Sequence, residues 1–377
     1  MVYLDNAATT KPCDEACKAV INGLEHFGNP SSLHNAGVDA EKLVTEAREI
    51  IASSIGANEE EIYFTSGATE SDNTAVFGAY KAHGKRKHRV VTTTVEHPAV
   101  AKPCDELEKL GCEVIRIRPD ENGIFHAEDI VNAVNDDTFL VSCMLVNNET
   151  GAVLPIEKAF ASVKRKYPDV LTHCDCVQGY MKLPVKVKKL NADMISLSGH
   201  KIYAPKGIGA IYVKKGIHIP PFMLGGGQEN GFRSGTESVP LISAFGAAVK
   251  KLKDNISENY KKAEELQKYL YEKCDNDQNI AKNYTVENSS PYVSSIAVKG
   301  LKSEVLLHFL ESKDVYVSSG SACSKGKKSS VLQEFRIPPE NLDSTLRISF
   351  STDTTKEDID LLIKAIEEAQ NKLAKLR

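Results

Sequence analysis

Short apolar segments alternate with amphipathic segments between about residues 35 and 250, and this alternation limits the possible folds more than any other feature. Seven short segments have the β-branched and aromatic composition of strands. They are 61–65, 89–94, 112–117, 139–145, 170–175, 194–197 and 209–213. Intervening segments such as 38–55 repeat apolar residues at helical spacing. Strands that alternate with helices in this way predict an α/β fold with a mostly parallel sheet covered by helices.

The pattern changes after about residue 250. The segment 250–274 has a long, charged helical pattern, and 356–376 is a closing amphipathic helix. Three strand-like segments and one more helical segment lie between them, at 292–298, 315–317, 345–350 and 303–312. This mixture is typical of a compact α+β domain. We therefore expect a large domain at 15–250 and a small α+β domain formed by 1–14 together with 251–377.

Composition and charge exclude several classes of protein. A net charge of −4 gives no reason to expect a nucleic-acid or membrane partner, and no apolar run approaches the length of a membrane span. The N-terminal segment lacks the basic and apolar regions of a signal peptide. Nine cysteines are spread along the chain, an odd number that favours reduced thiols over a disulfide framework. We expect a cytoplasmic protein without a resident metal.

A lysine and a carboxylate follow two of the predicted buried strands. Lys201 ends the motif Ser-Gly-His-Lys, and Asp175 ends an apolar strand with Gln178 three residues later. A buried carboxylate is costly unless it is paired, and a pyridinium nitrogen would pair with it. Sites for pyridoxal 5′-phosphate (PLP) need a Schiff-base lysine and such a partner. Gln178 could donate to the phenolic oxygen of PLP, and Ser198 and His200 to its phosphate.

Other polar residues lie at predicted strand ends, where open α/β sheets bind ligands. The turn at 66–69 suits a phosphate through its exposed N–H groups and the Thr69 hydroxyl, although a plain helix cap has the same composition. His97 could stack on a flat ring and move a proton, or be an ordinary hydrogen-bonded histidine. Asn147 and Asn148 suit a turn, but one of them could instead reach a cofactor or a substrate carboxylate.

The late part of the chain adds three candidates. Thr236 could supply one more phosphate ligand. Arg347, inside a predicted strand, could bind a substrate carboxylate through two hydrogen bonds or form a structural salt bridge. Cys323 follows a run of small residues and precedes several lysines, which would favour its thiolate as a nucleophile.

Taken together, these motifs resemble the NifS/IscS-type cysteine desulfurases, PLP enzymes of the class V aminotransferase family. The resemblance covers almost the entire chain, and its segments are 3–10, 28–34, 64–71, 96–97, 146–149, 198–201, 233–236, 318–323 and 347–349. It implies a fold-type-I, aminotransferase-like architecture with a mostly parallel seven-stranded sheet and a smaller α+β domain that carries the Cys323 loop. The context of Cys323 is similar to the group I branch.

The resemblance also implies a role for each candidate. Lys201 would be the Schiff-base lysine and would take the Cα proton, His97 would stack on PLP and move protons, and Asp175 and Gln178 would hold the ring. Asn148 would lie beside cofactor and substrate, and Arg347 would bind the substrate carboxylate. The phosphate ligands would be Ala68, Thr69, Ser198, His200 and, from the other subunit of a homodimer, Thr236.

Cys323 would attack the sulfur of L-cysteine, which yields a persulfide on Cys323 and L-alanine. The family often passes this sulfur to an iron–sulfur scaffold or a tRNA-thiolation enzyme, and Cys323 would transiently ligate a cluster with such a partner. Three alternatives remain open: a lyase acting on selenocysteine or cystine, an ordinary aminotransferase, and a non-enzymatic scaffold. Cys174 and Cys176, which flank Asp175, indicate either redox sensitivity or a variation in packing.

Overall fold

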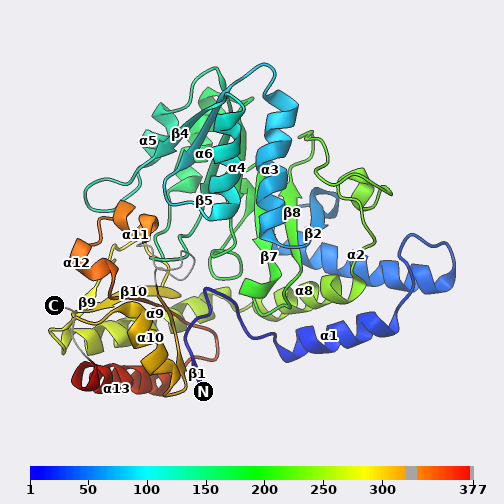
Figure 1. The fold of residues 1–377 in the computed structure, drawn as a ribbon. Helices are drawn as coiled ribbons and strands as arrows, with labels where there is room; N and C mark the ends of the chain where they lie inside the picture. Colours follow the sequence, from blue (N-terminus) through cyan, green and yellow to red (C-terminus); the bar gives the residue numbers. More distant parts are fainter. Residues whose placement is uncertain (320–328, 374–377) are drawn as a thin grey trace.

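The computed structural model describes residues 1–319 and 329–373. A seven-stranded sheet lies at its centre (Figure 1). Its strands, in spatial order, are β2 (Ile62–Thr65), β8 (Gly209–Val213), β7 (Met194–Ser198), β6 (Leu171–Asp175), β5 (Thr138–Met144), β3 (Arg89–Thr93) and β4 (Glu113–Ile117). β8 is antiparallel to both of its neighbours, and the other pairs are parallel. The predicted mostly parallel sheet is therefore confirmed.

Helices cover both faces of this sheet. α3 (Ala68–His83) and α4 (Pro98–Lys109) pack on one face with residues such as Val90 and Leu140. The next residues along the same strands, Val91 and Val141, belong to the cluster on the other face. That face is covered by α2 (Asn35–Ile55), α5 (Ala127–Asn132), α6 (Ile156–Lys166), α7 (Val187–Leu190) and α8 (Val239–Leu252), and α1 (Asp14–Glu25) packs on α8. The two-residue alternation of a strand thus places apolar side chains on both faces.

A smaller antiparallel sheet lies beside the large one at the lower left of Figure 1. Its order is β12 (Ser318–Ser319), β13 (Thr345–Ser349), β10 (Val293–Val298) and β9 (Ile280–Lys282). Leu4 joins an apolar cluster with residues of this sheet and of α9 (Ile256–Asp275), α10 (Ser303–Glu311) and α13 (Lys356–Lys372). β1 (Val2–Tyr3) pairs with β11 (Val315–Tyr316), so the start of the chain packs with its last third. The exact domain division stays a prediction.

Short helical turns connect these layers. They are η1 (Glu59–Glu61), η2 (Gly199–Lys201), η3 (Glu229–Gly231), α11 (Ser330–Glu334) and α12 (Pro339–Leu342). The helix predicted at 250–274 is instead interrupted, because α8 ends at Leu252 and α9 begins at Ile256. Within the described ranges, no helix is both long enough and apolar enough to cross a membrane.

Candidate active site

Three of the predicted site residues lie at one edge of the large sheet. Asp175 is the last residue of β6, Lys201 ends the short turn η2 that follows β7, and His97 caps α4 after β3. β3, β6 and β7 run in the same direction, so their carboxyl ends meet at the same edge. This is the edge at which open α/β sheets bind their ligands.

Lys201 and Gln178 converge on the N-terminal segment. The Lys201 ammonium donates to the carbonyl oxygens of Ala7 at 2.7 Å and Ala8 at 2.6 Å. The Gln178 amide nitrogen donates to the same Ala7 oxygen at 2.9 Å. Thr10 holds the segment in place, because its N–H donates to the carbonyl of His200 at 2.9 Å. The segment 3–10 was predicted to matter only through the family resemblance, and it contacts the site directly.

Asp175 and His97 influence one another electrostatically. Asp175 is only 5% exposed, and one of its oxygens accepts a hydrogen bond from the Val177 N–H at 2.9 Å. Burial raises the pKa of the Asp175 carboxyl, while the charges of His97 and Lys201 oppose that rise. Burial also lowers the pKa of His97, Asp175 raises it and Lys201 lowers it. The carboxylate therefore lies where a positively charged partner would offset its burial.

The predicted phosphate turn forms the start of α3. Among the described residues, the N–H groups of Ala68 and Thr69 donate to no protein acceptor, as expected at the first turn of a helix. Nearby, His200 contacts the Thr9 hydroxyl at 3.2 Å through Nδ1. Burial and adjacent lysines lower the pKa of His200 to about 4, so its ring is neutral near pH 7. Ser198 is buried at the end of β7.

Thr236 lies on an exposed loop near this turn. It lines a cavity of about 80 Å³ together with Ser66 and Gly207 of the same chain. The loop is held against α3 by an ion pair in which the Arg233 guanidinium donates to the Glu70 carboxylate at 2.7 Å. The prediction that Thr236 serves the phosphate site of a second subunit is not tested by these contacts.

Arg347 projects from β13 toward the N-terminal segment and the turn after β5. Its guanidinium donates to the Asp5 carboxylate at 2.8 Å and to the Asn148 carbonyl at 3.1 Å. The salt bridge that the sequence allowed is therefore present. Arg347 Nε is buried without a hydrogen-bond partner in the described structure, so one donor remains for a ligand. Asn147, in contrast, is a turn residue, because its side-chain oxygen accepts from the backbone of Glu149.

Cys323 lies outside the described residues, but both flanks of its segment lie close to Arg347. Ser318 is the register partner of Arg347 in the small sheet. On the other side, the Ser329 hydroxyl donates to the Glu149 carboxylate at 2.6 Å. Glu149 adjoins Asn148, whose carbonyl accepts from Arg347. The chain therefore leaves the described structure and re-enters it beside the same arginine.

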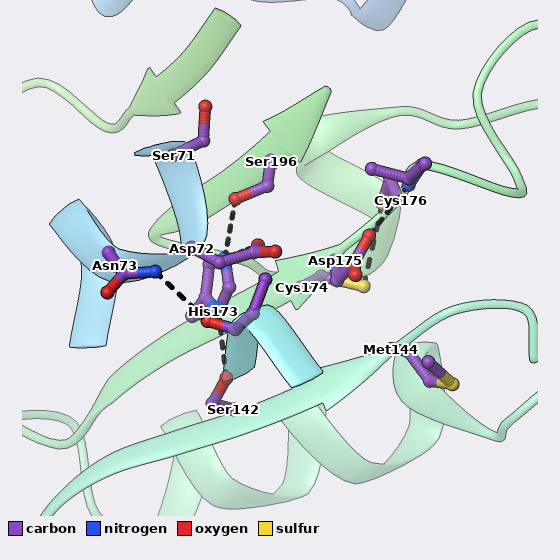
Figure 2. A network of polar contacts seen from close by, with 12 residues as sticks. Ser71, Asp72, Asn73, Ser142, Met144, His173, Cys174, Asp175, Cys176 and Ser196 are labelled. Atoms are coloured by element: carbon purple, nitrogen blue, oxygen red, sulfur yellow. Dashed lines mark hydrogen bonds and ion pairs between the residues drawn. The ribbon is translucent and has the colours of Figure 1, made fainter. Parts of the chain in front are cut away.

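A buried polar layer beneath Asp175 was missed by the sequence analysis (Figure 2). His173 contacts the hydroxyls of Ser142 at 2.8 Å and Ser196 at 2.9 Å. Burial lowers the pKa of His173 to about 3, which keeps the ring neutral. One oxygen of Asp72 lies 3.6 Å from the His173 ring, and burial raises the pKa of Asp72. Polar residues inside otherwise apolar strands were the signal that could have identified this layer.

The two cysteines beside Asp175 are both fully buried. The Cys176 thiol donates to Cys174 at 3.5 Å, and burial raises the pKa of the Cys174 thiol. A protonated, water-excluded thiol is a poor nucleophile. These contacts favour packing over redox sensitivity for this pair.

Glu96 lies in the same layer and gives a prediction about stability. One of its oxygens accepts hydrogen bonds from the Thr93 hydroxyl and the Met144 N–H, and the other has no partner among the described residues. Burial raises the pKa of the carboxyl from 4.5 to about 8. Between these values the unfolded chain ionises at this position while the folded chain does not, so the free energy of unfolding falls as pH rises.

We therefore expect Glu96→Gln to weaken the pH dependence of stability between about pH 5 and pH 8. Urea unfolding of the PLP-saturated protein measures the free energy of unfolding. Across this pH interval, that free energy should fall by on the order of 3 kcal/mol more in wild type than in the variant. Glu106→Gln, which changes an exposed carboxylate on α4, is the matched control and should behave like wild type. Equal pH slopes for wild type and Glu96→Gln would show that Glu96 is already ionised in the folded protein.

Known proteins of one family are similar to almost the whole chain. Residues 2–362 match the family described as aminotransferase class V. The chain is 38% identical over 379 residues to the cysteine desulfurase IscS of Dictyoglomus turgidum, which covers 99% of this chain and 95% of that relative. It is similar to the solved structure of a NifS-like protein, with a TM-score of 0.93, 35% identity, and coverage of 99% and 100% of the two chains. For a structure of SspA in complex with cysteine, the TM-score is 0.82, with 31% identity and coverage of 94% and 100%.

Proposed function

This chain belongs to the class V aminotransferase family, among its NifS/IscS-type cysteine desulfurases, and from that premise we propose how its site works. The protein converts L-cysteine to L-alanine and takes up the sulfur on Cys323 as a persulfide. One observation carries this proposal: Lys201, Asp175 and His97 meet at the carboxyl edge of the sheet, and Arg347 lies at the adjoining N-terminal segment.

The residues of this edge fit PLP. Asp175 is a buried carboxylate, and no cationic group of the described residues forms a hydrogen bond with it. A carboxylate that pairs with the pyridine nitrogen of PLP would have this arrangement. Gln178 would donate to the phenolic oxygen, and Lys201 would hold the aldehyde carbon through its amine. Ala68 and Thr69 at the start of α3, with Ser198 and His200, would hold the phosphate. When bound, PLP withdraws electrons from the Cα atom of an amino acid.

The side chains of this chain then move protons and hold the substrate. The Lys201 amine would take the Cα proton of the bound substrate, because the lysine lies at the same edge. His97, whose pKa is held down by burial, is positioned to pass a proton at its ring nitrogen near neutral pH. Arg347 binds the substrate carboxylate through its unpartnered donor beside Asn148.

Sulfur transfer needs a second thiol. The Cys323 thiolate attacks the sulfur of the bound cysteine, forming an S–S bond as the C–S bond breaks. The electron pair of the broken bond stays on the substrate carbon, which gains a proton and becomes the methyl group of alanine. Cys323 lies four residues after Ser319, the last described residue before it, and the neighbouring Ser318 is the register partner of Arg347. Its attachment beside Arg347 supports this role.

A second copy of the chain completes the proposal. Three large apolar side chains, Phe27, Leu33 and Leu224, are 87%, 98% and 84% exposed. Thr236 is exposed on the loop that follows Leu224. A homodimer that covers these side chains would remove apolar surface from water and bring Thr236 to the partner's phosphate site.

The persulfide requires an acceptor, and we extend the proposal to a protein of iron–sulfur assembly or tRNA thiolation. Cys323 would then serve as a transient cluster ligand with that partner, as in the group I branch. The eight cysteines of the described ranges are free, which supports a reducing, cytoplasmic compartment.

Product analysis tests the proposed function directly. Purified protein with PLP, L-cysteine and dithiothreitol, kept anaerobic, should release sulfide and L-alanine in equal amounts. Mercaptopyruvate in place of alanine, formed only when a 2-keto acid other than pyruvate is added as the amino acceptor, would indicate an aminotransferase. Turnover of selenocysteine or cystine without turnover of L-cysteine would indicate the related lyases, and a protein that binds no PLP would indicate a scaffold.

A further inference from the structure

Lys182 is a buried lysine to which the proposed function gives no task. It is 8% exposed and follows Met181, which adopts a left-handed backbone conformation with φ of 57°. Such a conformation is strained for a residue with a side chain, and it persists where the surrounding structure holds it. The strained residue directly precedes Lys182 in the chain.

The contacts of Lys182 do not compensate for burying a charge. Its ammonium donates to the Gln178 side-chain oxygen at 3.1 Å and lies 5.8 Å from the ring centre of Tyr292. No carboxylate of the described residues forms an ion pair with it. Burial, with the nearby charges of Lys201 and Arg347, lowers its pKa to about 7. A buried cation without a carboxylate partner costs stability, and such costs are common at functional sites.

A continuous chain of hydrogen bonds connects Lys182 with Lys201. Lys182 donates to the oxygen of the Gln178 amide, and the nitrogen of that amide donates to Ala7. Lys201 donates to the same Ala7 oxygen at 2.7 Å. An ammonium group can donate hydrogen bonds but cannot accept them, so it can bond only to the oxygen of an amide and not to its nitrogen. Lys182 thereby selects one of the two flipped orientations of Gln178, the one whose nitrogen faces the site.

We propose that Lys182 is a positioning residue that acts through Gln178, keeping the amide nitrogen aimed at the place where the phenolic oxygen of PLP would lie. The inference rests on the proposed function, because it concerns how the same site holds PLP. The inference adds Lys182 to the residues of that site and gives a reason why this lysine is buried.

Lys182→Met tests this inference, because methionine fills the same apolar path and donates nothing. In the substrate-free protein saturated with PLP, we expect the ratio of the two visible absorption bands of bound PLP to change, since their balance depends on the hydrogen bond to the phenolic oxygen. The dissociation constant for PLP should rise about tenfold, the effect of one lost hydrogen bond to a charged group. Lys186→Met is the control, because Lys186 donates to the Ser54 carbonyl away from this chain of contacts.

A double-mutant cycle separates action through Gln178 from independent action. Lys182→Met combined with Gln178→Leu should be no worse than Gln178→Leu alone. Gln178→Glu gives a second route, because it keeps a contact with an intact Lys182 and loses the nitrogen donor. This variant should reproduce the band change of Lys182→Met even where Lys182→Met folds poorly.

Two results would overturn the inference while leaving the proposed function intact. Additive effects in the cycle would show that Lys182 acts without Gln178. Unchanged absorption bands in both Lys182→Met and Gln178→Glu would reduce Lys182 to a packing role. Wild-type protein that takes up no PLP would be a different failure, since it would overturn the proposed function and this inference together.

Discussion

Lys201→Ala should reduce desulfurase activity at least about 1,000-fold, because the variant loses both the covalent attachment of PLP and the base for the Cα proton. The side chain of Lys201 reaches the carbonyl oxygens of Ala7 and Ala8, at the edge where Asp175 and His97 also lie. Lys201 ends η2, the turn that directly follows the buried strand β7. Activity is measured as sulfide and alanine released from L-cysteine.

Reduction of the PLP-loaded protein with borohydride identifies the attached lysine independently of turnover. Peptide mass analysis should find the reduced cofactor on Lys201 in wild type and on no peptide of Lys201→Ala. Lys182 is the competitor that makes this measurement informative, because it is also buried near the site and its pKa is about 7. Label on Lys182 would mean that the lysine assignment is wrong. Lys188→Ala, which changes an exposed lysine of α7, should label and turn over like wild type.

The sequence predicted the site residues that belong to single strand ends. Asp175 and Lys201 were identifiable because a polar residue directly after a buried strand must lie at the sheet edge. The antiparallel direction of β8 could also have been predicted from the sequence. Ten residues separate Ser198 from Gly209, and a parallel connection needs a crossover of about a dozen residues or more.

The missed residues depend on contacts between distant segments. Asp5 pairs with Arg347 across almost the whole chain, and no local pattern indicates that pairing. Lys182 looks like a surface lysine in sequence, but it is buried, and it follows Met181, whose left-handed backbone conformation composition does not reveal. Glu96 entered the prediction only within the segment 96–97 of the family resemblance, although its carboxyl accepts a hydrogen bond from the Met144 N–H at the end of β5. Register and long-range pairing, which follow from packing, determined these positions.

Cys323→Ser should abolish the release of both sulfide and alanine, with a loss of at least about 100-fold in turnover. A hydroxyl at this position cannot attack the substrate sulfur at neutral pH. The sulfur atom then has no acceptor, so the C–S bond stays intact and the bound cysteine is not converted. The variant should still bind PLP and L-cysteine, because Lys201, Asp175 and Arg347 are unchanged. Visible absorbance changes on addition of L-cysteine, without product release, would show this separation of binding from sulfur transfer.

The described residues on either side of the Cys323 segment strengthen that expectation. The segment is attached at both ends beside Arg347, through the Ser318 register and the hydrogen bond from Ser329 to Glu149. Cys17→Ser changes an exposed cysteine on α1 and is the matched control, which should keep full activity. Mass analysis of wild type after L-cysteine and without reductant should find one added sulfur atom on the Cys323 peptide. Products that persist in Cys323→Ser would contradict the persulfide step. They would favour a lyase that releases sulfur without a protein thiol, because a lyase of that kind needs the PLP edge of the sheet and no residue of the Cys323 segment.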